Sequence, residues 1–131
     1  MDRDEVADWV AAYQRAWRTP GTGVLTELFA PDATYMTAPY EQPYEGLAQI
    51  SVLWEREREG HDDVFTMESA IVAVEADTAV VRVHVQYGDP VEDEYRDLWI
   101  IRFDETGLCA AFEEWPLQDV GPAPEAPTVS T

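Results

Sequence analysis

The sequence predicts an α+β protein in which a curved, mostly antiparallel sheet wraps around N-terminal helices. In the first half, apolar residues recur at three- and four-residue spacings, as on amphipathic helices. In the second half they alternate with polar residues, as on half-buried strands. Turn-like segments separate these alternating runs, which predicts an antiparallel meander. Helices followed by a meander are typical of α+β domains.

Three helices and a short strand are predicted in the first half. Residues 4–17 form an amphipathic helix, 24–29 a short second helix and 33–38 a strand. After the proline-containing loop APYEQPYEG, a third helix is predicted. The apolar residues that define the first and third helices are Val6, Trp9, Val10, Tyr13, Trp17, Leu47, Ile50, Leu53 and Trp54.

Four strands are predicted in the second half, at 64–75, 78–88, 94–103 and 108–116. The 131 residues suffice for one domain with a substantial core. We expect that domain to span residues 1–117. Residues 118–131 are rich in proline and are predicted to form a flexible tail.

Composition excludes several function classes. The formal charge is −19, with eight arginines and no lysine, so nucleic acid is an unfavourable partner. Without lysine there is no Schiff base and no phosphate-loop lysine. None of the three serines lies in a nucleophile elbow. The sequence has no run of eighteen apolar residues and an acidic start, so we expect a cytoplasmic protein with no membrane partner.

Neither a metal site nor a cofactor is expected. Cys109 is single and is interpreted as a small core residue. His61 and His84 lack the spacing of metal ligands, and His84 is predicted on the outer face of its strand. The segment GHDD at 60–63 could bind a cation loosely, but a polar loop before a strand is the favoured explanation.

One carboxylate stands out within the strand EYRDLWIIRFD at 94–104. A two-residue period places Asp97 on the same face as Tyr95, Trp99, Ile101 and Phe103. If this strand and 108–116 pair without a skipped residue, Asp97 lies opposite Glu114 and Trp99 opposite Phe112. Two opposed carboxyl groups in an apolar interior would compete for one proton, as proton-transfer chemistry requires. A one-residue bulge would abolish this arrangement.

Aromatic side chains dominate the predicted interior and could surround a flat, apolar ligand. Tyr13, Tyr35 and Tyr87 are favoured as pocket residues, because a buried hydroxyl needs a hydrogen-bond partner. The full set of predicted ligand-binding residues is Trp17, Tyr35, Thr37, Tyr40, Trp54, Val85, Tyr87, Trp99 and Phe112. For the large aromatics the alternative is a well-filled core. For Asp97 it is a purely structural role as a hydrogen-bond acceptor.

Several motifs together resemble a known family. They are Tyr13 and Trp17 on the first helix, LFAPDATY at 28–35, a P-x-x-x-P-x-x-G loop ending at Gly46, a helix carrying Trp54, YRDLWIIRFD and FEEWP. This order is similar to the nuclear transport factor two-like superfamily, specifically its SnoaL-like branch. The resemblance implies a cone-shaped α+β barrel enclosing one pocket, in a homodimer joined through the outer sheet face.

The resemblance also implies roles for single residues. Tyr13 matches the tyrosine that steroid isomerases of this superfamily use as a hydrogen-bond donor, whereas Thr37 and Trp99 stand where their base and second acid would fall. Limonene epoxide hydrolases carry an Arg-x-Asp arrangement on a pocket strand, but Arg96 and Asp97 are adjacent here. Neither activity is therefore expected.

Two hypotheses follow. The first is a cofactor-independent isomerase, cyclase or dehydratase acting on a small apolar molecule, with Asp97 as base, Glu114 as acid and Tyr13 as hydrogen-bond donor. The second is a non-catalytic module that binds a small ligand or associates as a dimer. An open cavity with an unpaired carboxylate would favour the first hypothesis, and a filled interior with Asp97 fully bonded to protein groups would favour the second.

Overall fold

Two helices, one short 3-10 helix and a six-stranded sheet make up the computed structural model over the residues it describes, 1–59 and 65–118. In chain order they are α1 (Arg3–Arg18), η1 (Gly23–Glu27), β1 (Phe29–Met36), β2 (Tyr44–Glu45), α2 (Gly46–Glu59), β3 (Phe65–Glu75), β4 (Thr78–Tyr87), β5 (Asp93–Phe103) and β6 (Cys109–Gln118). The predicted α+β class is confirmed.

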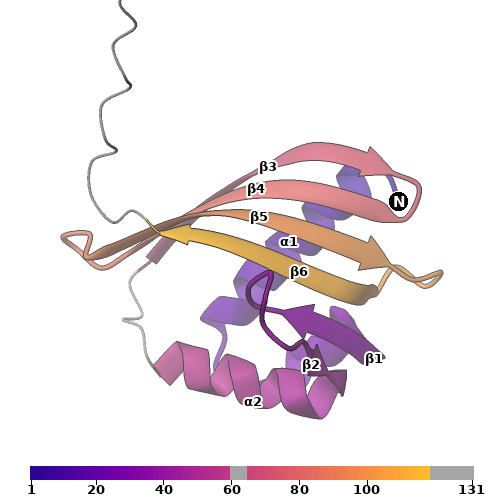
Figure 1. Cartoon of the computed structure of the whole chain (residues 1–131), viewed down its shortest axis with the longest axis horizontal. Coiled ribbons are helices and arrows are strands. Elements are labelled where there is room, and N and C mark those ends of the chain that lie inside the picture. Colours follow the sequence, from indigo (N-terminus) through magenta and orange to yellow (C-terminus); the bar gives the residue numbers. More distant parts are fainter. Residues whose placement is uncertain (60–64, 119–131) are drawn as a thin grey trace, which may run out of the picture.

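The strands form one curved sheet in the order β2-β1-β6-β5-β4-β3 (Figure 1). Strands β3 to β6 are the predicted antiparallel meander, and β1 joins it parallel to β6. The sheet is open, because β2 and β3 remain as its edges. The expected cone is therefore a strongly curved sheet and not a closed barrel.

Helix α1 crosses one face of the sheet and supplies much of the core (Figure 1). It begins with a capping box, in which the Asp2 carboxylate accepts from the Glu5 N–H at 2.8 Å and the Glu5 carboxylate accepts from the Asp2 N–H at 3.3 Å. Such a box satisfies two of the free N–H groups that every helix start leaves. Its buried stripe consists of Val6, Trp9, Val10, Tyr13 and Ala16.

The segment between the helices differs in detail from the prediction. The short second helix is a single 3-10 segment, and β1 starts at Phe29, four residues before the predicted strand. The proline-containing loop contributes an unpredicted two-residue strand, β2, which pairs with β1. Gly46 starts α2 with φ 81°, a left-handed conformation that favours glycine and explains why the loop motif ends in this residue.

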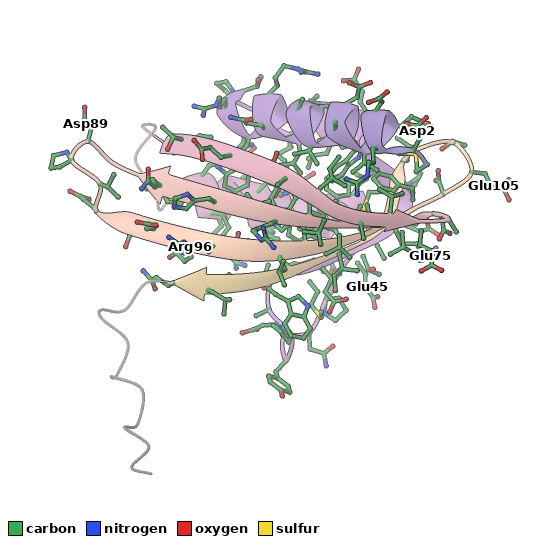
Figure 2. All side chains as sticks on the ribbon, turned by 90° about the horizontal axis from the view of Figure 1, so that it is seen from above. Asp2, Glu45, Glu75, Asp89, Arg96 and Glu105 are labelled. Carbon is green, nitrogen blue, oxygen red and sulfur yellow. The ribbon has the colours of Figure 1, made fainter. Side chains whose placement is uncertain are left out.

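The two ends of the sheet are unlike. Figure 2 shows Asp2 at the start of α1 close to the turns that carry Glu75 and Glu105, whereas Asp89, in the β4–β5 turn, lies at the opposite end. Strand β6 continues to Gln118, one residue beyond the predicted domain boundary. The predicted tail beyond Gln118, His61 and the GHDD segment lie outside the described residues.

Candidate functional site

A cavity of about 210 Å³ lies between the sheet and the helices, towards the end marked by the β4–β5 turn. Its walls come from the start of β3, the end of β4, the start of β5 and the end of β6, together with α1, β1 and α2. The lining residues are Tyr13, Trp17, Tyr35, Thr37, Leu53, Trp54, Glu57, Phe65, Met67, Val85, Tyr87, Tyr95, Asp97, Trp99, Glu114 and Pro116.

Most of the predicted site residues meet at this cavity. All three predicted catalytic residues line it, and so do Trp17, Tyr35, Thr37, Trp54, Val85, Tyr87 and Trp99. Phe112 does not line it, because its ring lies behind the wall, stacked on Tyr35 at 4.5 Å between ring centroids and buried to 1% exposure. Tyr40 lies outside the cavity and is fully exposed at 104%.

Six lining residues were not predicted, and some of them left a signal in the sequence. They are Leu53, Glu57, Phe65, Met67, Tyr95 and Pro116. Glu57 follows Leu53 and Trp54 at spacings of four and three, which places it on the same helix face. Phe65 and Met67 lie opposite Tyr87 and Val85 in the β3–β4 ladder, so the pairing of these strands would have found them.

Pro116 follows Glu114 by one strand period and therefore lies on the same face of β6, but the residue opposite it depends on the register of β5 and β6. The predicted register of these two strands is wrong by two residues. Asp97 lies opposite Pro116, and Glu114 opposite Trp99. Because two residues are one full period of a strand, Asp97 and Glu114 still face the same side of the sheet, as diagonal neighbours.

The turn between β5 and β6 explains the shift. The Asp104 carboxylate accepts hydrogen bonds from the backbone N–H groups of Thr106 and Leu108 at 2.8 and 3.1 Å, so the ladder starts with Phe103 opposite Cys109. Arg102 then lies opposite Ala111, and Ala110 is the extra residue of a bulge. The longer turn and the bulge each displace the register by one residue.

Burial raises the pKa of both acids. Asp97 is 5% exposed and is the only charged residue among the buried ones in the described ranges. Desolvation raises its pKa, while hydrogen-bonding contact from the Glu114 carboxyl and the Leu117 backbone acts in the opposite direction. Glu114 is half-buried, and its pKa is raised well above the ordinary value by desolvation, by its contact with Asp97 and by the nearby charge of Glu57.

The raised pKa values mean that both acids hold a proton more readily than they would in water, and that of Glu114 is raised well above its ordinary value. Such a pair titrates as a unit. The arrangement therefore places two carboxyl groups with raised pKa values in one cavity, where one can act as base and the other as acid.

Part of Asp97 remains without a partner. The Trp99 indole N–H is near enough to lower the pKa of Asp97, but it lacks the geometry of a hydrogen bond. Within residues 1–59 and 65–118, Asp97 Oδ1 and Trp99 Nε1 are consequently buried with no hydrogen-bond partner. The same is true of Trp54 Nε1.

A tyrosine pair forms another polar group in the cavity wall. The Tyr13 and Tyr35 hydroxyl oxygens are 2.6 Å apart in a hydrogen bond. Desolvation raises the pKa of both well above the ordinary value, so both are protonated at neutral pH. Either hydroxyl can be the donor of this hydrogen bond, and the hydroxyl that accepts keeps its own hydrogen for a ligand.

The cavity wall carries acids but no basic side chain: none of its lining residues is Arg, Lys or His. In the described part of the chain, no group of three or more His, Cys, Asp or Glu side chains is arranged to hold a metal ion. A carboxylate or phosphate ligand would therefore meet only like charge here.

Comparison with known proteins identifies relatives of this fold. The family model described as "SnoaL-like domain" matches residues 10–112. No curated protein shows significant similarity to the chain.

Among solved structures, a proposed polyketide cyclase from Sinorhizobium meliloti is 24% identical, with a TM-score of 0.65 over 82% of this chain and 93% of that one. SalBIII, an epoxide hydrolase/cyclase-like enzyme of pyran ring formation in polyether salinomycin, is 14% identical, with a TM-score of 0.72 over 88% and 92%. A steroid delta-isomerase from Pseudomonas aeruginosa is 21% identical, with a TM-score of 0.65 over 89% and 82%.

Neither α1 nor α2 has the length and apolar character needed to cross a bilayer, and no other helix occurs in the described ranges that could.

Proposed function

Because this chain belongs to the SnoaL-like domain family, we propose that it is a cofactor-independent enzyme that moves protons on a small, largely apolar organic molecule. The reaction class is isomerisation, cyclisation or dehydration. These reactions need a base and an acid held on one substrate, and a cavity lined by two coupled carboxyl groups supplies both.

The observation that carries this proposal is the state of Asp97. Its carboxyl group is buried, has a partner for only part of its hydrogen-bonding capacity and borders an open cavity. A structural acid of the same burial would be fully bonded to protein groups. The free oxygen is therefore suited to accept a proton from a bound molecule.

The proposed step begins with Asp97 taking a proton from a carbon next to a substrate carbonyl. The electron pair of that C–H bond becomes the new carbon–carbon double bond, and the carbonyl oxygen gains the charge. Tyr13 stabilises that oxygen by donating its hydroxyl hydrogen while it accepts a hydrogen bond from Tyr35. Glu114 then delivers its proton to a carbon of the enolate, whose double-bond electrons form the new C–H bond and restore the carbonyl. The proton on Asp97 passes to the ionised Glu114, directly or through solvent, which resets the pair.

Hydrogen–deuterium exchange at carbon tests this step without knowledge of the natural substrate. Enolisable cyclic ketones are incubated with the protein in D₂O, and NMR follows deuterium entering the position next to the carbonyl. Wild type should accelerate exchange. Asp97→Asn should lose about 10²–10⁴-fold of the acceleration, the usual contribution of a positioned base. Its melting temperature should change little, because the amide fills the same space.

A matched pair of variants on β6 sharpens the result. Glu114→Gln removes the proposed acid, while Glu113→Gln changes its neighbour, which faces the other side of the sheet opposite Ile100. We expect the first to slow exchange and the second to leave it unchanged. Full activity in Asp97→Asn would refute the assignment.

A non-catalytic role is the second candidate. It is favoured by the outer sheet face, where Leu98, Trp115 and Leu117 are 38%, 41% and 66% exposed, because side chains of this kind commonly mark association surfaces. In this case the domain would be a homodimeric ligand-binding or association module. Ligand binding without exchange at carbon by any ketone would support this alternative.

A further inference from the structure

Two tryptophans in the cavity wall are left with buried hydrogen-bond donors. Trp54 is 0% exposed and Trp99 is 3% exposed. Among residues 1–59 and 65–118, the buried side-chain polar atoms without a partner are Trp54 Nε1, Trp99 Nε1 and Asp97 Oδ1. All three belong to residues that line the one cavity described above.

Their grouping at one place is informative because buried polar groups are normally satisfied. Trp9 provides the comparison within this core. It is 6% exposed and does not line the cavity, and its indole N–H donates to the Leu28 carbonyl at 3.0 Å. The unsatisfied donors therefore belong to residues of the cavity wall, whereas the indole of this core tryptophan is satisfied by protein.

The two tryptophans come from different elements, and both rings pack against Tyr13. Trp54 is on α2 and Trp99 on β5, and their ring centroids lie 5.0 and 4.6 Å from that of Tyr13. A compact ligand near Tyr13 could thus present an oxygen to either indole. The cavity volume of about 210 Å³ lies below the range of about 300–1,000 Å³ common for drug-sized ligands, so the ligand is small.

We propose that Trp54 and Trp99 are specificity-determining residues, whose indole N–H groups select an uncharged ring compound bearing carbonyl or hydroxyl oxygens. The inference rests on the proposed ligand site but not on catalysis there. An indole N–H only donates, so its partner must be an acceptor. The acids of the wall exclude an anionic acceptor, which leaves neutral oxygen.

Asp97 extends this recognition. Its free Oδ1 lies near the Trp99 indole without a hydrogen bond between them. A ligand hydroxyl between the two groups would accept from the indole and donate to the carboxylate. The hydrocarbon part of the ligand would contact Trp17, Tyr87 and other rings of the wall.

The test compares two probes that differ by one oxygen, α-tetralone and tetralin, whose affinities are measured by calorimetry. Wild type should prefer the ketone. Trp54→Phe and Trp99→Phe keep an aromatic ring and remove the donor, so the loss of ring area should weaken both probes alike. The ratio of the two affinities should fall by between about twofold and tenfold where a hydrogen bond is lost, and furthest in the double variant.

Trp9→Phe is the control, because it removes an indole donor from the core away from the cavity. It should lower stability but leave the ketone preference intact. The inference is overturned if wild type shows no ketone preference up to the solubility limit, or if the double variant retains the full preference, as it would if water alone satisfied the indoles.

The proposed function can fail separately. Loss of ketone preference in the tryptophan variants, without any exchange at carbon in wild type, would support this inference and refute the catalytic proposal. Exchange at carbon that depends on Asp97, together with an unchanged ketone preference in the Trp54→Phe/Trp99→Phe double variant, would support the catalytic proposal and refute this inference.

Discussion

Asp97 and Glu114 interact although they are not directly opposed on their strands. A glutamate side chain can span the diagonal between neighbouring strands, whereas a shorter acid at position 114 would reach less far. The sequence places Asp97 on the inner face by alternation alone, and this holds in the structure. The raised pKa of Glu114, however, depends on burial by residues from several elements, which no local pattern contains.

The raised pKa values of these acids make stability depend on pH in a definite direction. Between the ordinary carboxyl pKa of about 4 and the raised folded values, the folded protein holds more protons than the unfolded one. The stability linked to these groups is therefore complete below about pH 4 and is lost as pH rises through the folded pKa values.

Glu114→Gln should remove most of this dependence. The variant should unfold at a higher temperature than wild type at neutral pH, by a few degrees for each ~1 kcal/mol recovered, and the difference should vanish near pH 4. Thermal unfolding of both proteins across this pH range measures it. Glu94 and Asp104 have lowered pKa values, so their contribution to stability is lost as pH falls. Both residues are present in wild type and in the variant, so this contribution cancels when the two unfolding temperatures are compared. A difference that grows as pH falls would contradict the prediction.

At the scale of elements, the β5–β6 hairpin decides the site. Alternation along each strand predicts which residues face inwards, but the register is set by the Asp104 turn and the bulge at Ala110. The longer turn alone would shift the register by one residue and turn Glu114 to the outer face. The bulge at Ala110 adds a second one-residue shift, which returns Glu114 to the inner face. The prediction of a shared face was right and its pairing was wrong, because turn length and bulges have weak signatures in a sequence.

The start of α1 shows the reverse case, in which local residues determine the structure. Asp2→Ala removes the carboxylate that accepts from the Glu5 N–H and should lower the free energy of unfolding by roughly 0.5–2 kcal/mol. Asp2→Asn keeps an acceptor of the same size and should cost much less. Chemical denaturation of both variants measures these changes. Equal losses of unfolding free energy in the two variants would show that the charge of Asp2 stabilises the helix and that its hydrogen bond to the Glu5 N–H does not.

At the scale of the whole molecule, the curved sheet separates an inner face that lines the cavity from an outer face that is more exposed. His84 and Glu94 form a 2.7 Å contact on the outer face, as alternation predicts for His84. Apolar Leu98 lies on the same face, between Arg82 of β4 and Trp115 of β6. This combination is compatible with the homodimer that the family resemblance implies.

We therefore expect a dimer in solution that depends on the outer face. Trp115→Glu should shift the molar mass measured by light scattering towards the monomer, because it places a charge in the centre of the proposed contact. Val52→Glu, at another exposed apolar side chain of 63% exposure, should leave the mass unchanged. A wild-type monomer at high protein concentration would refute the expected dimer.

The sequence by itself determined the helices, the meander, the inward direction of Asp97 and the acidic character of the chain. These properties depend on residue type and on periods of two or about four residues, which are local. The structure alone decided the register of β5 and β6 and the unsatisfied state of Trp54 and Trp99. Each of these depends on contacts between segments distant in the sequence, whose geometry is fixed only when the elements pack.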